Sequence, residues 1–125
     1  MARILVIDDD ASICEIVRAM LGKAGHVVSA ASNGRLGLAS LAREPVELVI
    51  ADIVMPEMDG IETVRRLRSM TRPPRIIVMT GGSREGAMDQ LAAARSLGAD
   101  ATLTKPLRAQ HLLDTTAELL RRPSS

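Results

Sequence analysis

The chain begins with the stretch Ile4-Leu5-Val6-Ile7-Asp8-Asp9-Asp10, four aliphatic residues that end in three carboxylates. A continuous apolar run of this length is typical of a strand buried on both faces of a parallel sheet. Four more short apolar runs follow, at residues 27–31, 46–51, 76–79 and 101–104. Between the runs the apolar residues take a helical period, as at Ile13, Ile16, Val17, Met20 and Leu21. The sequence therefore predicts five strands that alternate with five helices.

This alternation also predicts the architecture. Strands and helices that follow one another in turn form a parallel sheet with helices on both faces, which is the α/β class. A chain of 125 residues is too short for an eight-fold barrel, which takes about 250 residues. An open, doubly wound five-stranded parallel sheet remains, a (βα)5 fold. We assign residues 1–122 to one domain and residues 123–125 to a tail or the start of a linker.

The composition excludes several classes of function. The chain has no Phe, Tyr or Trp, so it cannot stack nucleic-acid bases on aromatic rings. Its 16 basic and 15 acidic residues are too balanced for a dedicated nucleic-acid surface, and we expect no direct nucleic-acid binding. No stretch reaches the ~20 apolar residues of a membrane span. With no signal-peptide layout and one cysteine, Cys14, we expect a cytoplasmic protein without membrane contact.

Side chains that can take part in a reaction or bind a ligand lie at the ends of four of the predicted strands. Asp8 and Asp9 follow the first strand, Asp52 the third, Thr80 ends the fourth, and Lys105 follows the fifth. Ligands of open α/β sheets bind outside the carboxyl ends of the strands. We therefore expect three carboxylates, one hydroxyl and one ammonium at the same edge of the sheet.

These groups suit the transfer of a phosphoryl group. Carboxylates within a few Å repel one another, and a hard divalent cation relieves the repulsion. Mg²⁺ prefers oxygen ligands from carboxylates, water and phosphate. Three carboxylates, Mg²⁺ and the Lys105 ammonium sum to zero charge, and one carboxylate can then attack phosphorus to form an aspartyl phosphate. The hydroxyl of Thr80 and the backbone of Gly81 can donate to the phosphoryl oxygens.

Over about residues 2–120 the chain resembles the receiver domains of two-component response regulators. Four segments carry the resemblance: Ile4-Leu5-Val6-Ile7-Asp8-Asp9-Asp10, Asp52-Ile53-Val54-Met55-Pro56-Glu57-Met58-Asp59-Gly60, Val78-Met79-Thr80-Gly81, and Gly98-Ala99-Asp100 through Lys105-Pro106. The resemblance implies a flavodoxin-like sheet with the strand order 2-1-3-4-5.

The resemblance also implies a role for each site residue. Asp52 would accept the phosphoryl group from a phosphohistidine on a sensor histidine kinase or a histidine phosphotransferase. Lys105 would pair with that group, and Thr80 would bond to it and move. Pro106 would follow a cis peptide bond, and Gly60 would allow a tight turn. The ligands of Mg²⁺ would be Asp8, Asp9, Asp52 and the backbone carbonyl of Val54.

The function expected from this resemblance is a phosphorylation-dependent signalling switch that acts on a downstream protein target. It is not an enzyme, beyond slow dephosphorylation of itself. Three alternatives stay open: the receiver portion of a longer transcription factor or output enzyme, a phosphorelay carrier, and a receiver that is not phosphorylated. The last is disfavoured because all five site residues are present.

The chain departs from the family pattern in two places. Receivers usually carry Tyr or Phe where this chain has Thr102, and often Phe where it has Leu107. Without a ring, we expect weaker or differently routed coupling between Asp52 and the fourth helix. The glycines between Gly81 and Gly86 also predict a mobile loop before that helix.

The remaining polar residues have ordinary explanations. Asp10 is predicted as a helix cap, and Cys14, off the apolar face of its helix, as an inert thiol. His26 and His111 lack partners at metal-ligand spacing. A basic cluster is formed by Arg65, Arg66, Arg68, Arg72 and Arg75. We interpret it as a solvated face, with a docking surface as the alternative.

Overall fold

The structure, a computed structural model, describes residues 1–53, 60–81 and 87–122. Its strands are β1 (Arg3–Ile7), β2 (Val27–Ala31), β3 (Leu48–Asp52), β4 (Arg75–Thr80) and β5 (Ala101–Thr104). They pair in parallel in the order β2-β1-β3-β4-β5. The predicted five-stranded parallel sheet and its strand order are confirmed. The predicted tail, residues 123–125, and the predicted mobile loop, residues 82–86, lie outside the described residues.

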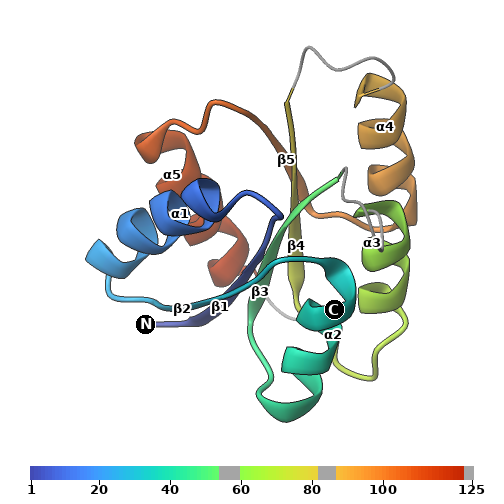
Figure 1. The fold of residues 1–125 in the computed structure, drawn as a ribbon, viewed down its shortest axis with the longest axis horizontal. Coiled ribbons are helices and arrows are strands. Elements are labelled where there is room, and N and C mark those ends of the chain that lie inside the picture. Colours follow the sequence, from blue (N-terminus) through green and yellow to red (C-terminus); the bar gives the residue numbers. More distant parts are fainter. Residues whose placement is uncertain (54–59, 82–86, 123–125) are drawn as a thin grey trace.

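Helices cover both faces of the sheet. They are α1 (Ala11–Lys23), α2 (Gly34–Arg43), α3 (Gly60–Arg68), α4 (Ala87–Leu97) and α5 (Ala109–Arg121). Helices α1 and α5 lie on one face, and α2, α3 and α4 lie on the other (Figure 1). This is the doubly wound arrangement that the alternation of strands and helices predicts. None of the helices in the described ranges is long and apolar enough to cross a bilayer.

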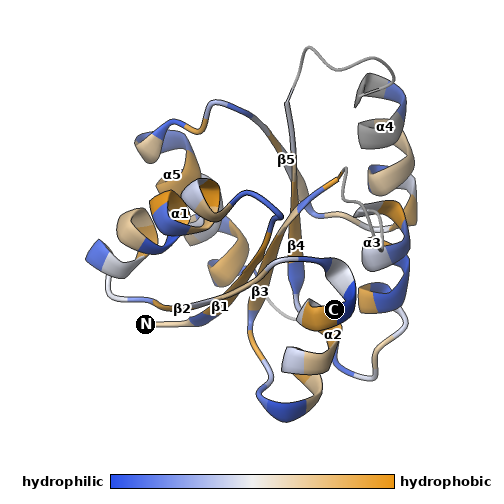
Figure 2. Ribbon diagram, in the orientation of Figure 1, coloured by the Kyte–Doolittle hydropathy of each residue, from blue (hydrophilic) through white to orange (hydrophobic). Residues whose placement is uncertain are grey.

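The apolar core has two halves, one on each face of the sheet, because side chains along a strand point alternately to opposite faces. Ile4 and Val6 of β1 belong to the cluster under α1 and α5. Leu5 and Ile7 belong to the cluster under α2, α3 and α4. Figure 2 shows hydrophobic residues along much of β1 and β3, in the middle of the molecule, and a mixture of hydrophilic and hydrophobic residues along the helices. The continuous apolar run at residues 4–7 is thus explained by burial on both faces.

The buried face of α1 differs from the one that the spacing predicts. The buried residues are Cys14, Val17 and Leu21, whereas Ile16 is 41% exposed. The interpretation of Cys14 as lying off the apolar face was wrong. Its thiol is turned toward β1 and donates to the carbonyl oxygen of Asp8 at 3.5 Å. The helix is rotated about its own axis so that Cys14, Val17 and Leu21 face the sheet, and spacing along the helix does not determine that rotation.

Helix α2 packs against the sheet with two glycines as well as a leucine. Leu36 is 43% exposed, while Gly34, Gly37 and Leu41 are buried. A Cβ atom at Gly37 would lie 2.5 Å from Cδ1 of Ile7. The missing side chain lets the backbone of α2 approach the sheet closely.

The strand ends also differ slightly from the predicted runs. The third strand begins at Leu48 and ends at Asp52, two positions and one position later than the apolar run at 46–51. The fourth strand ends at Thr80, as predicted. Asp52 is the last residue of the third strand instead of the residue after it, and both side chains lie at the carboxyl edge of the sheet.

Candidate functional site

Parallel pairing brings the predicted site residues to one edge of the sheet. Asp52 and Thr80 are the last residues of β3 and β4, and Asp8 and Lys105 directly follow β1 and β5. These four strands are consecutive neighbours in the sheet. The shared edge follows from topology, since all strands run in the same direction.

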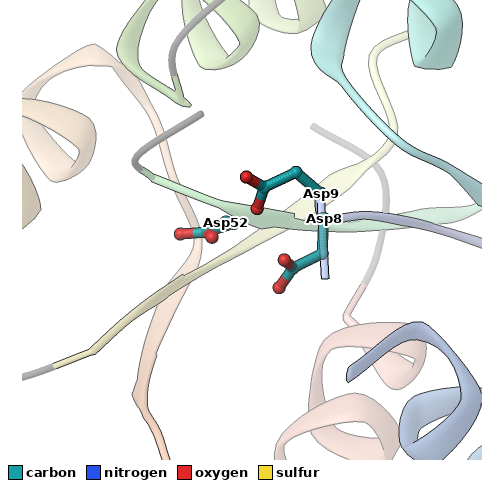
Figure 3. Close-up of side chains that lie close together, drawn as sticks. All are labelled: Asp8, Asp9 and Asp52. Atoms are coloured by element: carbon teal, nitrogen blue, oxygen red, sulfur yellow. The ribbon is translucent and has the colours of Figure 1, made fainter. Parts of the chain in front are cut away.

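Three carboxylates gather at this edge. One carboxylate oxygen from each of Asp8, Asp9 and Asp52 lies within 4.8 Å of the other two. Figure 3 shows the three side chains close together, two from the end of β1 and one from the end of β3. Asp8 and Asp52 are buried and Asp9 is exposed. An all-oxygen set with one solvent-facing member could hold a hard divalent cation that keeps some of its water.

Lys105 lies between the two buried carboxylates. Its ammonium Nζ donates to Oδ2 of Asp8 at 2.9 Å and to Oδ2 of Asp52 at 3.3 Å. Its backbone N–H donates to the carbonyl oxygen of Thr80 at 2.7 Å, which ties β5 to the end of β4. The peptide bond to Pro106 is cis, as the resemblance implies. Lys105 lies 97 positions from Asp8 along the chain, yet its ammonium group is hydrogen-bonded to the Asp8 carboxylate.

The pKa values of both Asp8 and Lys105 are raised, for different reasons. Desolvation raises the pKa of Asp8, helped by repulsion from Asp52, and outweighs the hydrogen bonds from Asp10 and Lys105. Desolvation alone would lower the pKa of Lys105, but the two carboxylates outweigh it and the pKa is raised. The ammonium is therefore held in its charged form. One cation against three carboxylates leaves the cluster with excess negative charge, so the donor set fits a divalent cation.

Asp10 orients Asp8 and begins the following helix. Its side chain accepts a hydrogen bond from the backbone N–H of Ser12 at 2.9 Å, so the predicted helix cap is confirmed. Its own backbone N–H donates to Oδ1 of Asp8 at 2.9 Å. With Lys105 on Oδ2, both oxygens of the Asp8 carboxylate have protein donors.

Thr80 has a buried hydroxyl with unused hydrogen-bonding capacity. The residue is 1% exposed, and its Oγ1 has no hydrogen-bond partner among the described residues. A buried hydroxyl without a partner costs about 1–3 kcal/mol. Such a group at the carboxyl edge can donate to an anionic oxygen that arrives beside it.

Gly60 shows why a side chain is not tolerated where α3 begins. Its N–H donates to the carbonyl oxygen of Ile53 at 2.8 Å, and a Cβ atom would lie 2.5 Å from that same oxygen. Close approach of the Ile53 backbone therefore requires glycine at this position, while the residues before it, 54–59, where the predicted tight turn falls, lie outside the described residues. Val54, the fourth predicted metal ligand, lies outside the described residues.

A hydrogen bond occupies the position where receivers usually carry a ring. The guanidinium of Arg95, on α4, donates to Oγ1 of Thr102, on β5, at 2.8 Å. Sequence reasoning identified the missing ring but missed Arg95. The only signal was a basic residue in the last turn of the fourth helix. Helix α4 and strand β5 are thus joined by a polar contact.

The sequence matches a known family over most of its length. The family model described as response regulator receiver domain matches residues 4–117. A response regulator named MprA from Mycolicibacterium vanbaalenii is 38% identical over 120 residues, which are 96% of this chain and 51% of that protein. The transcriptional regulatory protein ZraR from Klebsiella oxytoca is 38% identical over 117 residues, which are 94% of this chain and 26% of that protein. The chain thus spans about half the length of MprA and about a quarter of the length of ZraR.

Solved structures give the same result for the fold. A response regulator receiver domain protein from Clostridium thermocellum superposes with a TM-score of 0.89 at 31% identity, covering 98% of this chain and 96% of that one. The chemotaxis response regulator CheY4 of Vibrio cholerae superposes with a TM-score of 0.85 at 30% identity, covering 95% of this chain and 98% of that one.

Proposed function

The chain belongs to the response regulator receiver domain family, and from this premise we propose that it is a phosphorylation-dependent switch whose phosphoacceptor is Asp52. The donor is a phosphohistidine on a sensor histidine kinase or a histidine phosphotransferase. One observation carries the proposal: the Lys105 ammonium lies 2.9 Å from Asp8 and 3.3 Å from Asp52, within the three-carboxylate cluster. A positive charge beside Asp52 supports the proposal, because it can pair with the charge of an incoming phosphoryl group.

We propose that Asp8, Asp9 and Asp52 hold Mg²⁺, with the backbone carbonyl of Val54 as a further ligand. When bound, the ion would neutralise charge on the phosphoryl oxygens and on the carboxylates. The support is the oxygen-only donor set, with one carboxylate oxygen of each aspartate within 4.8 Å of the others. Asp9 is the exposed member of the set, so it would bind the ion on the side that faces solvent.

The transfer is a displacement at phosphorus. A carboxylate oxygen of Asp52 forms a P–O bond while the P–N bond to the donor histidine breaks, and the bonding electron pair stays on the imidazole nitrogen. The phosphoryl group replaces one negative charge at Asp52 by about two. Lys105 then pairs with the new charge, and the hydroxyl of Thr80 donates to a phosphoryl oxygen, satisfying the group that has no partner in the described structure.

The consequence is signalling and not turnover of a substrate. Engagement of Thr80 and Lys105 favours one arrangement of the β4 and β5 ends, and a downstream protein target would read it. Slow self-dephosphorylation is the only expected catalytic activity. The Arg95–Thr102 hydrogen bond would carry part of the coupling between β5 and α4 in place of the usual ring.

A second arrangement is supported by the coverage of the relatives. Since MprA-like regulators extend to about twice the matched length, this chain would act as the receiver portion of a longer regulator, whose attached domain it controls. Determining the coding sequence downstream of Ser125 distinguishes this arrangement from a receiver that acts alone or as a phosphorelay carrier.

The test is phosphorylation by a small phosphodonor such as acetyl phosphate, followed by intact-protein mass spectrometry. With Mg²⁺, the wild-type chain should gain one phosphoryl group, and Asp52→Asn should gain none. Asp114→Asn, which changes an exposed aspartate on α5, is the matched control and should be labelled normally. EDTA should abolish labelling. Labelling of Asp52→Asn to the wild-type extent would refute the assignment of the phosphoacceptor.

A further inference from the structure

A second concave surface lies at the opposite edge of the sheet from the carboxylate cluster. It is a cavity of about 520 Å³ bounded by the segment that leads into β4, the end of α3 and the end of α5. Arg75, the first residue of β4, lines it, whereas Thr80 at the other end of the same strand belongs to the candidate site. We call this surface the amino-edge cavity.

Four arginines and one glutamate line the amino-edge cavity. They are Arg68, Arg72, Arg75, Arg122 and Glu47. The remaining wall is largely apolar and includes Pro74 and Leu119, both buried. The local charge is strongly positive in a chain whose total charge is only +1.

The structure divides the basic cluster that the sequence shows. Arg65 and Arg66 form ion pairs with Glu62 on α3, at 2.7 and 3.6 Å, and do not line the cavity. Arg68, Arg72 and Arg75 do line it, and α5 adds Arg122 from far along the chain. Arg68 and Arg72 are exposed as well, so the predicted solvated face also holds for them. What sets them apart from Arg65 and Arg66 is that they line the cavity.

Two of the four arginines that line the cavity already have partners at the end of α5, and two do not. Arg75 donates to the backbone carbonyl oxygen of Arg122 at 2.9 Å, at the negative end of the α5 dipole. Arg122 also pairs with Glu118 at 2.9 Å. For the guanidinium groups of Arg68 and Arg72, no hydrogen-bond acceptor or acidic partner is found within residues 1–53, 60–81 and 87–122. These two cations are available to a ligand.

Arg68 has a defined position. A Cβ atom at Gly98 would lie 2.7 Å from Nε and 2.9 Å from Cδ of Arg68, so the arginine side chain lies directly across this glycine. Gly98 has a φ of +116°, a conformation that glycine adopts without strain. Packing against the loop after α4 restricts the arginine, which reduces the entropy that it would lose on binding an anion.

We propose that the amino-edge cavity binds a small molecule that carries a diphosphate group. A guanidinium group can bind a phosphate group through two parallel N–H···O hydrogen bonds. Several guanidinium groups at one concave surface therefore suit a ligand with more than one phosphate. A volume of about 520 Å³ lies in the range of small-molecule sites, and the apolar wall can contact an organic part of the ligand. The proposal is independent of phosphorylation at Asp52, because it uses the other edge of the sheet.

The experiment is a titration of the 125-residue chain with pyrophosphate and with ADP, followed by calorimetry and by backbone amide NMR. EDTA is present, so that a metal cannot bring either probe to Asp8, Asp9 and Asp52. The test variant is Arg68→Gln/Arg72→Gln. The matched control is Arg65→Gln/Arg66→Gln, which removes the same net charge from the same region outside the cavity. Orthophosphate is the single-phosphate comparison.

We expect saturable binding of pyrophosphate, with amide shifts at Glu47, Thr71 and Arg75. Orthophosphate should bind at least tenfold more weakly than pyrophosphate. Arg68→Gln/Arg72→Gln should weaken binding of pyrophosphate at least tenfold, and the control less than twofold. Tighter binding of ADP than of pyrophosphate would identify an organic diphosphate as the ligand, and equal binding would identify the diphosphate alone.

Three results would overturn the proposal. Equal weakening by both double variants would mean that only the general charge attracts anions. Shifts confined to the edge that carries Asp52 would place the anion elsewhere. Binding of an acidic peptide such as poly-glutamate without binding of pyrophosphate would make the cavity a protein-docking surface. Amide spectra of both variants establish that the fold is retained.

Discussion

Thr116 carries a buried hydroxyl that costs stability, and replacing it by valine should make the protein more stable. The residue is on α5 and 1% exposed, and its Oγ1 has no hydrogen-bond partner among the described residues. Valine keeps the branched shape and puts a methyl group where the hydroxyl was. The two residues have similar helix propensities, so the change in free energy reports on the hydroxyl itself.

The expected gain follows from the cost of an unpaired buried polar group. That cost is about 1–3 kcal/mol, and we take the lower end, about 1 kcal/mol, for a single hydroxyl. For a domain of this size, about 1 kcal/mol raises the midpoint of thermal unfolding by roughly 4 °C. Urea unfolding at pH 7 should show a higher midpoint at an unchanged slope.

The neighbouring residue Thr115 provides the control. It is half-buried, so its hydroxyl can reach water, and Thr115→Val should leave the free energy of unfolding unchanged. A Thr116→Val variant that is no more stable than Thr115→Val would show that the Thr116 hydroxyl is satisfied, and the reasoning would fail.

The same argument applied to Thr80, which is equally buried, predicts that Thr80→Val gains similar stability but responds poorly to phosphorylation.

Further predictions concern the turn into α3, the lysine and the thiol. Gly60→Ala should lose about 1–3 kcal/mol in urea unfolding, because its Cβ would meet the backbone of Ile53; Gly22→Ala, with nothing within 4 Å, should lose none. Lys105→Ala should still bind Mg²⁺, measured by titration, yet lose most of the conformational response to beryllofluoride; a wild-type response would remove the lysine from the mechanism. Burial, helped by the charge of Asp8, raises the pKa of the Cys14 thiol, so native protein should react slowly with a thiol reagent. The folded state holds this proton more tightly than the unfolded state, so the contribution of the thiol to stability is full below the unfolded pKa and is lost as pH rises through the folded pKa. Wild type should therefore lose more stability than Cys14→Ala above about pH 9, and parallel pH profiles for the two proteins would contradict this.

The order of elements and the edge of the sheet that carries the site could be predicted because both follow from local patterns. A strand buried on both faces must be apolar along its whole length, as at residues 4–7. In a parallel sheet, all strands end at the same edge, so residues at or directly after the strand ends lie there together, as Asp8, Asp52 and Lys105 do. The predicted metal ligands Asp8, Asp9 and Asp52 were brought together by this rule, while their roles stay proposals.

The errors arise where packing chooses between similar local options. Cys14 is buried and Ile16 exposed, because α1 packs with the side that carries Cys14, Val17 and Leu21 against the sheet. Hydrophobicity alone favoured Ile16, the wrong residue.

The amino-acid sequence by itself determined the alternation of strands and helices, the carboxyl edge with its acidic residues, and the absence of an aromatic switch. Only the tertiary structure decided that Lys105 bridges Asp8 and Asp52, that Arg95 bonds to Thr102, and that distant arginines share one cavity. The physical reason is range. Periodicity and strand ends are set by neighbours within a few residues, whereas a distance of about 3 Å between side chains depends on the packing of whole elements against one another.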